Sequence, residues 1–393
     1  MNAMHLFTFK KLLILGIVCG LLFTNLDAAR QQHPSLEPIR VGVFLDLSGR
    51  TSSYGTATLN GVKLAADEIN AYRGTDRRRV ELHIEDDSGR PDEAATVARR
   101  LIDQKKVHAL VGEVASSNTL AAAPIAQNAK VPLITSATHL AITQVGNYVF
   151  RVGVVDPFQA QALAQFAIRT LKVKRVALLV DATSDYSQDL AAAFEKSLTG
   201  LGGLIVLKQS YAGGDKDFAA QLVAIKRSNP DVVFIPGYYS EAGPIARQAK
   251  QLGLTKPLLG CDGWDSPQLW ELGGNALNGA YIANHYAVDN PSSANKEFVS
   301  KYKARYESAE PDSLAALGYD AMKLLADAVS RAGTIDGPSL QRALAETRGF
   351  EGVTGTITMD ENRNPLRAVI LRLQDGKFLY RATVLPTKAN GRN

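Results

Sequence analysis

Short hydroxyl and amide side chains gather where one apolar segment gives way to a helical pattern. Residues 110–130 read LVGEVASSNTLAAAPIAQNAK, an apolar run that ends at Gly112, followed by exposed-type polar residues at 116–119 and then by a run rich in alanine. Serine and asparagine commonly satisfy free N–H groups at helix starts. The same N–H groups and hydroxyls can instead receive an anion. The segment therefore predicts either ordinary capping by surface side chains or a carboxylate site.

Other apolar runs of strand length also end in residues that could bind a ligand. In open α/β sheets, ligands bind in the crevice at the carboxyl ends of the strands. The first half of the sequence supplies hydroxyls and backbone N–H groups at these ends, and the second half supplies aromatic rings and one acid. The candidates are Asp46, Ser48, Gly49, Ser53, Tyr54, Gly55, Ser116, Ser117, Thr135, Ser136 and Thr138, and then Ser184, Asp185, Tyr186, Gly237, Tyr238, Tyr239, Cys261, Asp262, Gly263 and Trp264. The first set suits a carboxylate and the second suits an ammonium group with an apolar body, so together they predict a zwitterion.

Each candidate also has a purely structural interpretation. Ser116 and Thr138 could be helix caps, and Tyr238 and Tyr239 could be ordinary core or surface aromatics. An aspartate before glycine, as at Asp262, is common in turns. Only the coincidence of these residues at strand ends in both halves favours binding.

Motifs of the common enzyme classes are missing from the sequence. Its six histidines show no metal-ligand spacing, and HExxH, CxxC, GxxxxGK[ST] and GxSxG do not occur. Residues 293–296 match the SxxK pattern, but they lie in a polar segment before a predicted helix, so we attribute the match to chance. We therefore expect a protein that is not an enzyme and needs no cofactor or metal. A hydrolase would require a histidine beside Ser116 or Ser184.

Strand-length apolar runs alternate with segments of helical periodicity behind these candidates. Strands are predicted at 39–45, 80–85, 107–111 and 131–134, with helices between them, and the alternation restarts after 149–155. After Gly279 the order changes to one strand, three helices at 295–306, 314–332 and 339–347, and three short β-like stretches. This order predicts an α/β protein with two doubly wound, Rossmann-like lobes joined by a hinge of several crossovers.

The N-terminal residues 1–28 have the layout of a secretory signal peptide. Lys10 and Lys11 precede an apolar run at 12–23, which is shorter than the ~20 residues of a membrane span, and small residues follow. We expect an exported, periplasmic protein that is not anchored as a lipoprotein through Cys19. Removal of the leader would leave Cys261 as the single cysteine, which excludes an intramolecular disulfide and suits a buried structural residue.

The charge balance argues against nucleic acid as a partner. The formal net charge is +5 over 393 residues, which is mild, and the sharpest basic run, at 77–79, reads as a solvated turn.

Several long segments resemble the branched-chain amino acid-binding proteins of bacterial ABC transporters, the Leu/Ile/Val-binding members of the type I periplasmic binding proteins. The resemblance covers about residues 38–385. It rests on IRVGVFLDLSGRTSSYG, LNGVKLAADEIN, ELHIEDDSGRPDEAA, VHALVGEVASSNTLAAAPIA, VPLITSATHLAIT, DFAAQLVAIK, DVVFIPGYYSEAGPIARQAKQLGL and ALGYDAMKLLADA.

The resemblance implies a role for each of seven residues. Ser116 and Thr138 would hold the α-carboxylate of an amino acid, and Ser136 would offer its backbone carbonyl to the amino group. Asp262 would pair with the α-ammonium group, assisted by Tyr238. In addition, Tyr186 would close over the ligand from the second lobe, and Tyr54 would wall the side-chain pocket.

The chain also departs from the family pattern. The segment VPLITSATHLAIT is one residue shorter than the commoner SPAAT version, which bears on Ser136. Leucine binders often carry glutamate where this chain has Asp262. A disulfide of some members cannot form, because Gly89 and Ala115 stand at the corresponding places.

The sequence thus predicts the substrate-binding subunit of an ABC transporter, a monomer that captures an aliphatic amino acid between its lobes and docks on a membrane permease. Lobe 1 is predicted at 38–155 with 286–359, lobe 2 at 156–285 with 360–386, and a disordered tail at 387–393. The alternatives are a receptor of the same fold for an amide, urea or an aromatic acid, and a ligand-sensing subunit of a signalling system.

Overall fold

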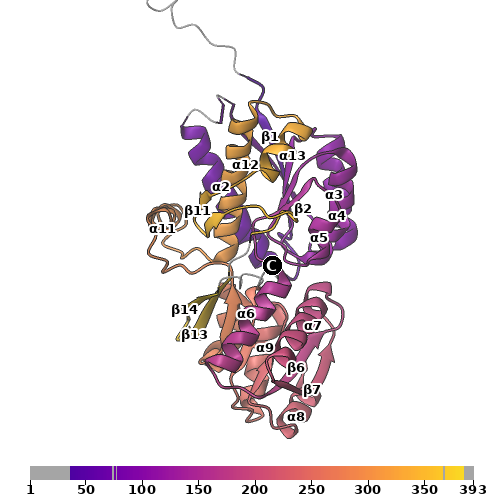
Figure 1. Ribbon diagram of the computed structural model, residues 1–393, viewed down its shortest axis with the longest axis vertical. Helices are drawn as coiled ribbons and strands as arrows, with labels where there is room; N and C mark the ends of the chain where they lie inside the picture. The colour runs from indigo at the N-terminus through magenta and orange to yellow at the C-terminus, as the bar shows by residue number, and fades with distance from the viewer. Residues whose placement is uncertain (1–35, 73–74, 77, 366–367, 385–393) are drawn as a thin grey trace, which may run out of the picture. The chain divides into compact units, whose positions relative to one another are not determined.

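The computed structural model describes residues 36–72, 75–76, 78–365 and 368–384 (Figure 1). The predicted signal peptide at 1–28 and the predicted tail at 387–393 lie outside these residues. The strands are β1 (Ile39–Leu45), β2 (Val80–Asp86), β3 (Ala109–Gly112), β4 (Leu133–Thr135), β5 (Val149–Arg151), β6 (Arg175–Asp181), β7 (Leu204–Tyr211), β8 (Val232–Phe234), β9 (Leu258–Gly260), β10 (Tyr281–Asn284), β11 (Phe350–Gly352), β12 (Gly355–Ile357), β13 (Ala368–Gln374) and β14 (Lys377–Val384). The helices are α2 (Ser52–Ala71), α3 (Pro91–Asp103), α4 (Ser116–Ala129), α5 (Ala141–Gln144), α6 (Asp156–Arg169), α7 (Asp185–Gly200), α8 (Ala219–Arg227), α9 (Tyr239–Gln251), α10 (Pro267–Gly273), α11 (Ser293–Arg305), α12 (Ser313–Ala332) and α13 (Gly337–Ala345), with 3-10 helices η1 (Asp262–Trp264) and η2 (Gly274–Leu277).

The first sheet has five parallel strands in the order β2-β1-β3-β4-β5. Its inner strand β1 is buried on both faces: Val41 and Val43 belong to one apolar core and Phe44 to another. Helices α2 and α12 pack side by side, while α3 packs against α4 (Figure 1). Alternating β-branched residues with cover on both faces explain why this run forms a buried parallel strand. We call this sheet and its helices the first lobe.

The second sheet has seven strands in the order β14-β13-β10-β9-β8-β6-β7. Its parallel part runs from β10 to β7, and β13 joins β10 in antiparallel fashion and continues into the β14 hairpin. Helix α6 packs against α7, whereas α9 packs against α10 and η2. We call this sheet and its helices the second lobe. The predicted α/β fold of two doubly wound lobes is confirmed.

The chain passes between the lobes three times within the described residues. It leaves the first sheet after β5, returns after β10 to form α11, α12 and α13, and enters the second sheet again at β13. These passages occur near residues 152–155, 285–292 and 358–365. Among the described residues no helix combines the length and the apolar character that a bilayer span requires.

Two helices begin earlier than the apolar periodicity of the sequence indicates. That periodicity predicts helices only from residues 190 and 245, whereas α7 begins at Asp185 and α9 at Tyr239. The polar start of α7 and the Gly243-Pro244 pair in α9 concealed these first turns, because such residues usually indicate loops. The candidate residues Ser116, Tyr186 and Tyr239 therefore lie in the first turns of helices.

Candidate functional site

The start of α4 carries no capping side chain. The N-cap residue is Ala115, whose side chain cannot accept a hydrogen bond, so the N–H groups of the first turn have no side-chain cap. The serines are not caps, and the predicted exposure of residues 116–119 was also wrong, since Ser116 is 1% exposed and Thr119 fully buried. Capping thus fails to explain Ser116. An uncapped helix start with a buried hydroxyl suits a carboxylate.

Neighbouring polar contacts fix this helix start in place. The hydroxyls of Thr119 and Thr135 both donate to the carbonyl oxygen of Glu113, at 3.0 and 2.6 Å. The Ser116 hydroxyl accepts a hydrogen bond from the backbone N–H of His139 at 3.3 Å. Ser116 is therefore tied directly to the segment that carries Thr138.

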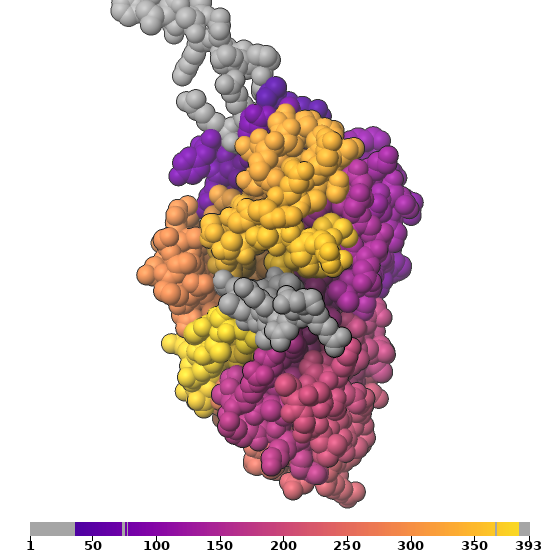
Figure 2. Space-filling model, viewed as in Figure 1, coloured from indigo at the N-terminus to yellow at the C-terminus, as the bar shows by residue number. Residues whose placement is uncertain are grey.

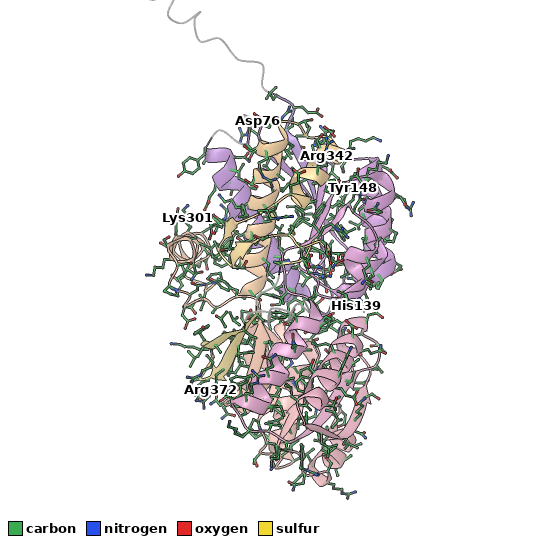
Figure 3. All side chains as sticks on the ribbon, in the orientation of Figure 1. Asp76, His139, Tyr148, Lys301, Arg342 and Arg372 are labelled. Atoms are coloured by element: carbon green, nitrogen blue, oxygen red, sulfur yellow. The ribbon has the colours of Figure 1, made fainter. Side chains whose placement is uncertain are left out.

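Arg151 fixes the segment around Thr138 through hydrogen bonds to its backbone. Its guanidinium, fully buried, donates to the carbonyl oxygens of Ala137, at 2.6 Å, and of His139, the two residues that flank Thr138. A third bond, of 2.6 Å, reaches the side chain of Asn364 in the last crossover. Burial lowers the pKa of Arg151 to about 10. Figure 3 labels His139 where elements of the first lobe meet those of the second.

The second lobe contributes the carboxylate of Asp262, which contacts a tyrosine hydroxyl and a histidine ring. The Asp262 carboxylate accepts a hydrogen bond from the Tyr186 hydroxyl at 2.9 Å and lies 3.1 Å from Nε2 of His285. Burial alone would raise the pKa of Asp262, but His285 and Tyr186 outweigh it and hold the pKa below its usual value. The carboxylate is therefore ionised, and its side chain keeps 12% exposure. A buried anion of this kind suits an ammonium group.

The tyrosines form a stack beside this acid. The rings of Tyr186 and Tyr238 are stacked with centroids 5.1 Å apart, and Tyr54 of the first lobe meets Tyr238 edge-on at 5.8 Å and Tyr239 at 4.9 Å. The Tyr54 hydroxyl donates to the carbonyl oxygen of Gly263. Because Tyr54 lies in α2 of the first lobe and Gly263 in η1 of the second, this contact joins the two lobes.

Ser136 and His285 both pack against a glycine. A Cβ at Gly153 would lie 2.7 Å from the Ser136 carbonyl oxygen and 3.4 Å from the ring of His285. The absence of a Cβ therefore lets this carbonyl and the imidazole that contacts Asp262 both approach the backbone of Gly153. The structure brings all seven sequence-predicted residues into one connected region; their roles toward a ligand stay predictions.

Two polar residues of this region were not predicted as site residues. Asp156 and Gln159 are fully buried in the first turn of α6, and their side-chain oxygens and nitrogen lack well-formed hydrogen bonds. Burial and the charge of Asp262 raise the pKa of Asp156, against the Thr138 hydroxyl and Arg151. Gln159 contributes to the lowered pKa of Asp262. The sequence signal for this pair was a spacing of three residues, which places both on one face of a helix. An acid at a helix start is, however, usually explained by its favourable interaction with the helix dipole.

Arg50 was also missed. Its Nη1 lies 3.2 Å from Glu241 and 3.6 Å from Asp181, both on the second lobe and almost fully buried, and its guanidinium lies 5.6 Å from the centre of the Tyr238 ring. No sequence pattern links Arg50 to Asp181 or Glu241, because each lies more than a hundred residues further along the chain. These contacts join the lobes beside the tyrosine stack.

The hydrolase alternative finds no support in this geometry. His285 contacts Asp262, and His139 meets the Ser116 hydroxyl only through its backbone N–H. Within the described residues no group of three or more His, Cys, Asp or Glu side chains could hold a metal ion. Cys261, directly after β9, is fully buried, as predicted for a structural residue.

Comparison with known proteins gives one family and a consistent set of structures. A family model described as periplasmic binding protein matches residues 38–376. A leucine binding protein, LivK, from Thermotoga maritima is 39% identical with a TM-score of 0.85, over 88% of this chain and 99% of the other. LivJ from Streptococcus pneumoniae, solved in complex with isoleucine, is 34% identical with a TM-score of 0.85, over 89% and 100%. A solute binding protein from Rhodopseudomonas palustris in complex with 3,4-dihydroxybenzoic acid is 28% identical with a TM-score of 0.80, over 91% and 99%.

Proposed function

The chain belongs to the periplasmic binding protein family, and on that premise we propose that it is the substrate-binding subunit of an ABC transporter that captures a branched-chain amino acid. The observation that carries this proposal is the pairing of an uncapped helix start at Ser116 with the ionised Asp262 of the other lobe. The relatives described as leucine binding and as a complex with isoleucine favour an aliphatic side chain.

In this proposal the first lobe binds the carboxylate of the amino acid, and the second lobe provides the negative charge for its ammonium group. Ser116 and Thr138 hold the carboxylate, Asp262 receives the ammonium group with Tyr238 beside it, and the Ser136 carbonyl completes the amino end. A ligand shifts the open–closed equilibrium only through contacts that differ between the two states. A zwitterion meets this condition, because its two heads are satisfied together only when the lobes are closed.

Two leucine analogues test the proposal directly. Calorimetry should show binding of leucine, isoleucine and valine, while 4-methylpentanoate, which lacks the ammonium group, and 3-methylbutylamine, which lacks the carboxylate, should bind at least about 100-fold more weakly. The expected loss follows because each analogue leaves one end of the site without its partner, either the Asp262 carboxylate or the donors around Ser116. Equal affinity for leucine and either analogue would contradict the two-headed site.

A second candidate is a receptor for an aromatic acid. The relative in complex with 3,4-dihydroxybenzoic acid and the four tyrosines near Asp262 favour this alternative. The same experiment, with 3,4-dihydroxybenzoate added to the panel, separates the two, because an aromatic acid brings no ammonium group to Asp262. Tighter binding of the benzoate than of leucine would decide for this candidate.

The partner and the location belong to the same proposal. The chain would be exported by the leader at 1–28, act in the periplasm as a monomer, and present its closed form to a membrane permease. Its role would be capture and release, without covalent chemistry. Co-purification with a permease encoded beside it would support transport over a sensing role.

A further inference from the structure

A second cavity lies outside the region around Ser116 and Asp262. It has a volume of about 500 Å³ and is lined from the start of α12 by Asp312 and Ser313, from α10 by Trp270, and from β14 by Phe378. None of the seven proposed amino acid-binding residues lines it. The segment after α11 and the β13–β14 hairpin, which border this cavity, lie next to each other in Figures 1 and 2. A volume in this range is typical of small-molecule sites.

Three aromatic rings form much of the cavity wall. Trp270 and Phe378 meet edge-to-face with ring centres 6.1 Å apart, at an angle of 72°. Tyr286 is fixed through its hydroxyl, which donates to the side chain of Asn295 at 2.6 Å. Aromatic faces attract cations, most strongly where water is excluded.

Two neighbouring carboxyl groups of the wall form no ion pair with a described residue, although Lys377 lines the same cavity. Asp265, 4% exposed, accepts hydrogen bonds from the Asn284 side chain at 2.8 Å and the Ser313 N–H at 2.9 Å, both neutral donors. Asp312 accepts one from the Ala315 N–H at 2.8 Å. No ion pair joins either carboxyl to a Lys, Arg or His among the residues that the structure describes. Two such groups side by side need a proton or a cation between them.

An independent feature points to a hydrogen-bonding ligand. Ser313 is fully buried and lines the cavity, yet its hydroxyl oxygen has no hydrogen-bond partner. Buried hydroxyls are normally satisfied, and an exception calls for an explanation. The Nε1 atom of Trp270 is buried and unpartnered in the same cavity.

We propose that this cavity binds an organic cation, a primary ammonium group on an aromatic or branched apolar body. The ammonium group would lie between the Asp312 carboxylate and the Ser313 hydroxyl, and the body would lie between Trp270 and Phe378. A metal ion suits the cavity less well, because apolar and aromatic side chains form much of its wall and the described residues include no metal-binding cluster. The inference does not depend on which solute occupies the region around Asp262.

The probe is 2-phenylethylammonium, compared with neutral 2-phenylethanol and anionic 3-phenylpropionate. Calorimetry and ligand-observed NMR on the purified protein should show binding of the amine, with the alcohol and the acid at least about tenfold weaker. D312N, which keeps an oxygen for the α12 cap, and F378A should each weaken the amine by about tenfold or more. E361Q, a change at an exposed acid outside the cavity, should have no effect.

Proton release gives a second readout. Burial and the charge of Asp265 raise the pKa of Asp312 to about 8, with Asp289, Glu310, Lys377 and Tyr286 also at the cavity wall. The Asp312 carboxyl is thus mostly protonated at pH 7, and a cation must displace that proton. Amine affinity should therefore rise between about pH 6.5 and 8.5, and this rise should vanish in D312N.

Three results would overturn the proposal. One is absence of amine binding at millimolar concentration, and another is binding of the alcohol as tight as that of the amine. The third is loss of amine binding in D262N but not in D312N, because this would place the amine between the lobes. Circular dichroism of each variant checks that its fold is intact.

Discussion

At the scale of single residues, the chemistry of the region depends on keeping one buried carboxylate charged and another neutral. Asp262 has its pKa lowered by His285 and Tyr186, while burial and the nearby charge of Asp262 raise the pKa of Asp156 well above its usual value. Two adjacent buried acids cannot both ionise cheaply, so the environment separates their protonation states. The ionised member lies beside the tyrosine stack, where we place the ammonium group.

Removal of the charge at Asp262 should weaken leucine binding. We expect D262N to lower the affinity by about 2–5 kcal/mol, because an ammonium group would then be buried without its counter-ion. The amide keeps the size of the side chain and an acceptor for the Tyr186 hydroxyl, so the fold should persist. Calorimetry with leucine measures the change, and E361Q is the matched control at an exposed acid. An affinity unchanged in D262N would remove this residue from the site.

The protonation states also predict how leucine affinity depends on pH. A lowered pKa keeps Asp262 ionised at a pH where an ordinary aspartate, with a pKa of about 3.9, is half protonated. Affinity should therefore stay constant from about pH 8 to pH 5 and fall only below about pH 4. Titrations across this range measure it. A decline that begins above about pH 5 would contradict the control of binding by Asp262.

Sequence reasoning found Asp262 and Tyr238 because both directly follow apolar strands, where a parallel sheet presents its binding edge. It did not find Asp156 or Gln159, because their importance comes from burial beside Asp262, which lies more than a hundred residues further along the chain. It also left capping open for Ser116. Only the helix start at Ala115, known from coordinates, excludes that interpretation.

At the scale of elements, the turn before α2 acts as a connector between the lobes. The Asp46 carboxylate accepts hydrogen bonds from the N–H of Gly49, at 2.5 Å, and from the N–H and hydroxyl of Thr51, at 2.8 and 2.7 Å. This shapes the turn so that Arg50 extends toward Glu241 in the first turn of α9 and Asp181 at the end of β6. Two buried acids of the second lobe thus share one guanidinium of the first lobe.

Loss of this contact should favour the open form. We expect R50A to weaken leucine binding by about 1–2 kcal/mol, roughly 5- to 30-fold, because the Arg50 contacts require closed lobes. The effect should be small, because the Arg50 side chain is 37% exposed and solvent partly screens its charge. Calorimetry gives the affinity, and small-angle scattering with leucine gives the degree of closure.

The control for this change is R90A. Among the described residues, the ion pairs of Arg90 are with Asp92 and Glu93 at the start of α3, so its removal should leave affinity and closure unchanged. Equal affinities for R50A and the parent protein at low salt would show that Arg50 does not stabilise the closed form.

Element positions were largely predictable, because buried parallel strands read as continuous apolar runs. The missed first turns of α7 and α9 show where that reasoning stops. Ser184 caps α7 by accepting a hydrogen bond from the Ser187 N–H at 3.3 Å, so the polar residues that suggested a loop in fact begin a helix. This places Tyr186 on a rigid element.

At the scale of the whole molecule, function depends on contacts that span the lobes without touching a ligand. The Ser53 and Ser266 hydroxyls are 2.7 Å apart, and the Ser117 hydroxyl donates to Asp185 at 2.7 Å. Such contacts stabilise closure in the absence of solute as well, so they set how much binding energy a ligand must supply. No sequence pattern predicts them, because they join residues that the fold alone brings together.

A disulfide between the lobes tests whether opening controls ligand exchange. Sulfur atoms in place of the Ser53 and Ser266 oxygens need only a slight approach to reach bonding distance, and the one other cysteine of the described chain, Cys261, is buried and should not compete. Oxidation of the double variant S53C/S266C with leucine present should trap the amino acid, so that release into dialysis buffer slows by at least about tenfold. Reduction should restore release, and S53C alone should exchange leucine like the parent protein. If the oxidised and reduced forms release leucine equally fast, the solute does not lie between the lobes, and the division of its two heads between Ser116 and Asp262 fails with it.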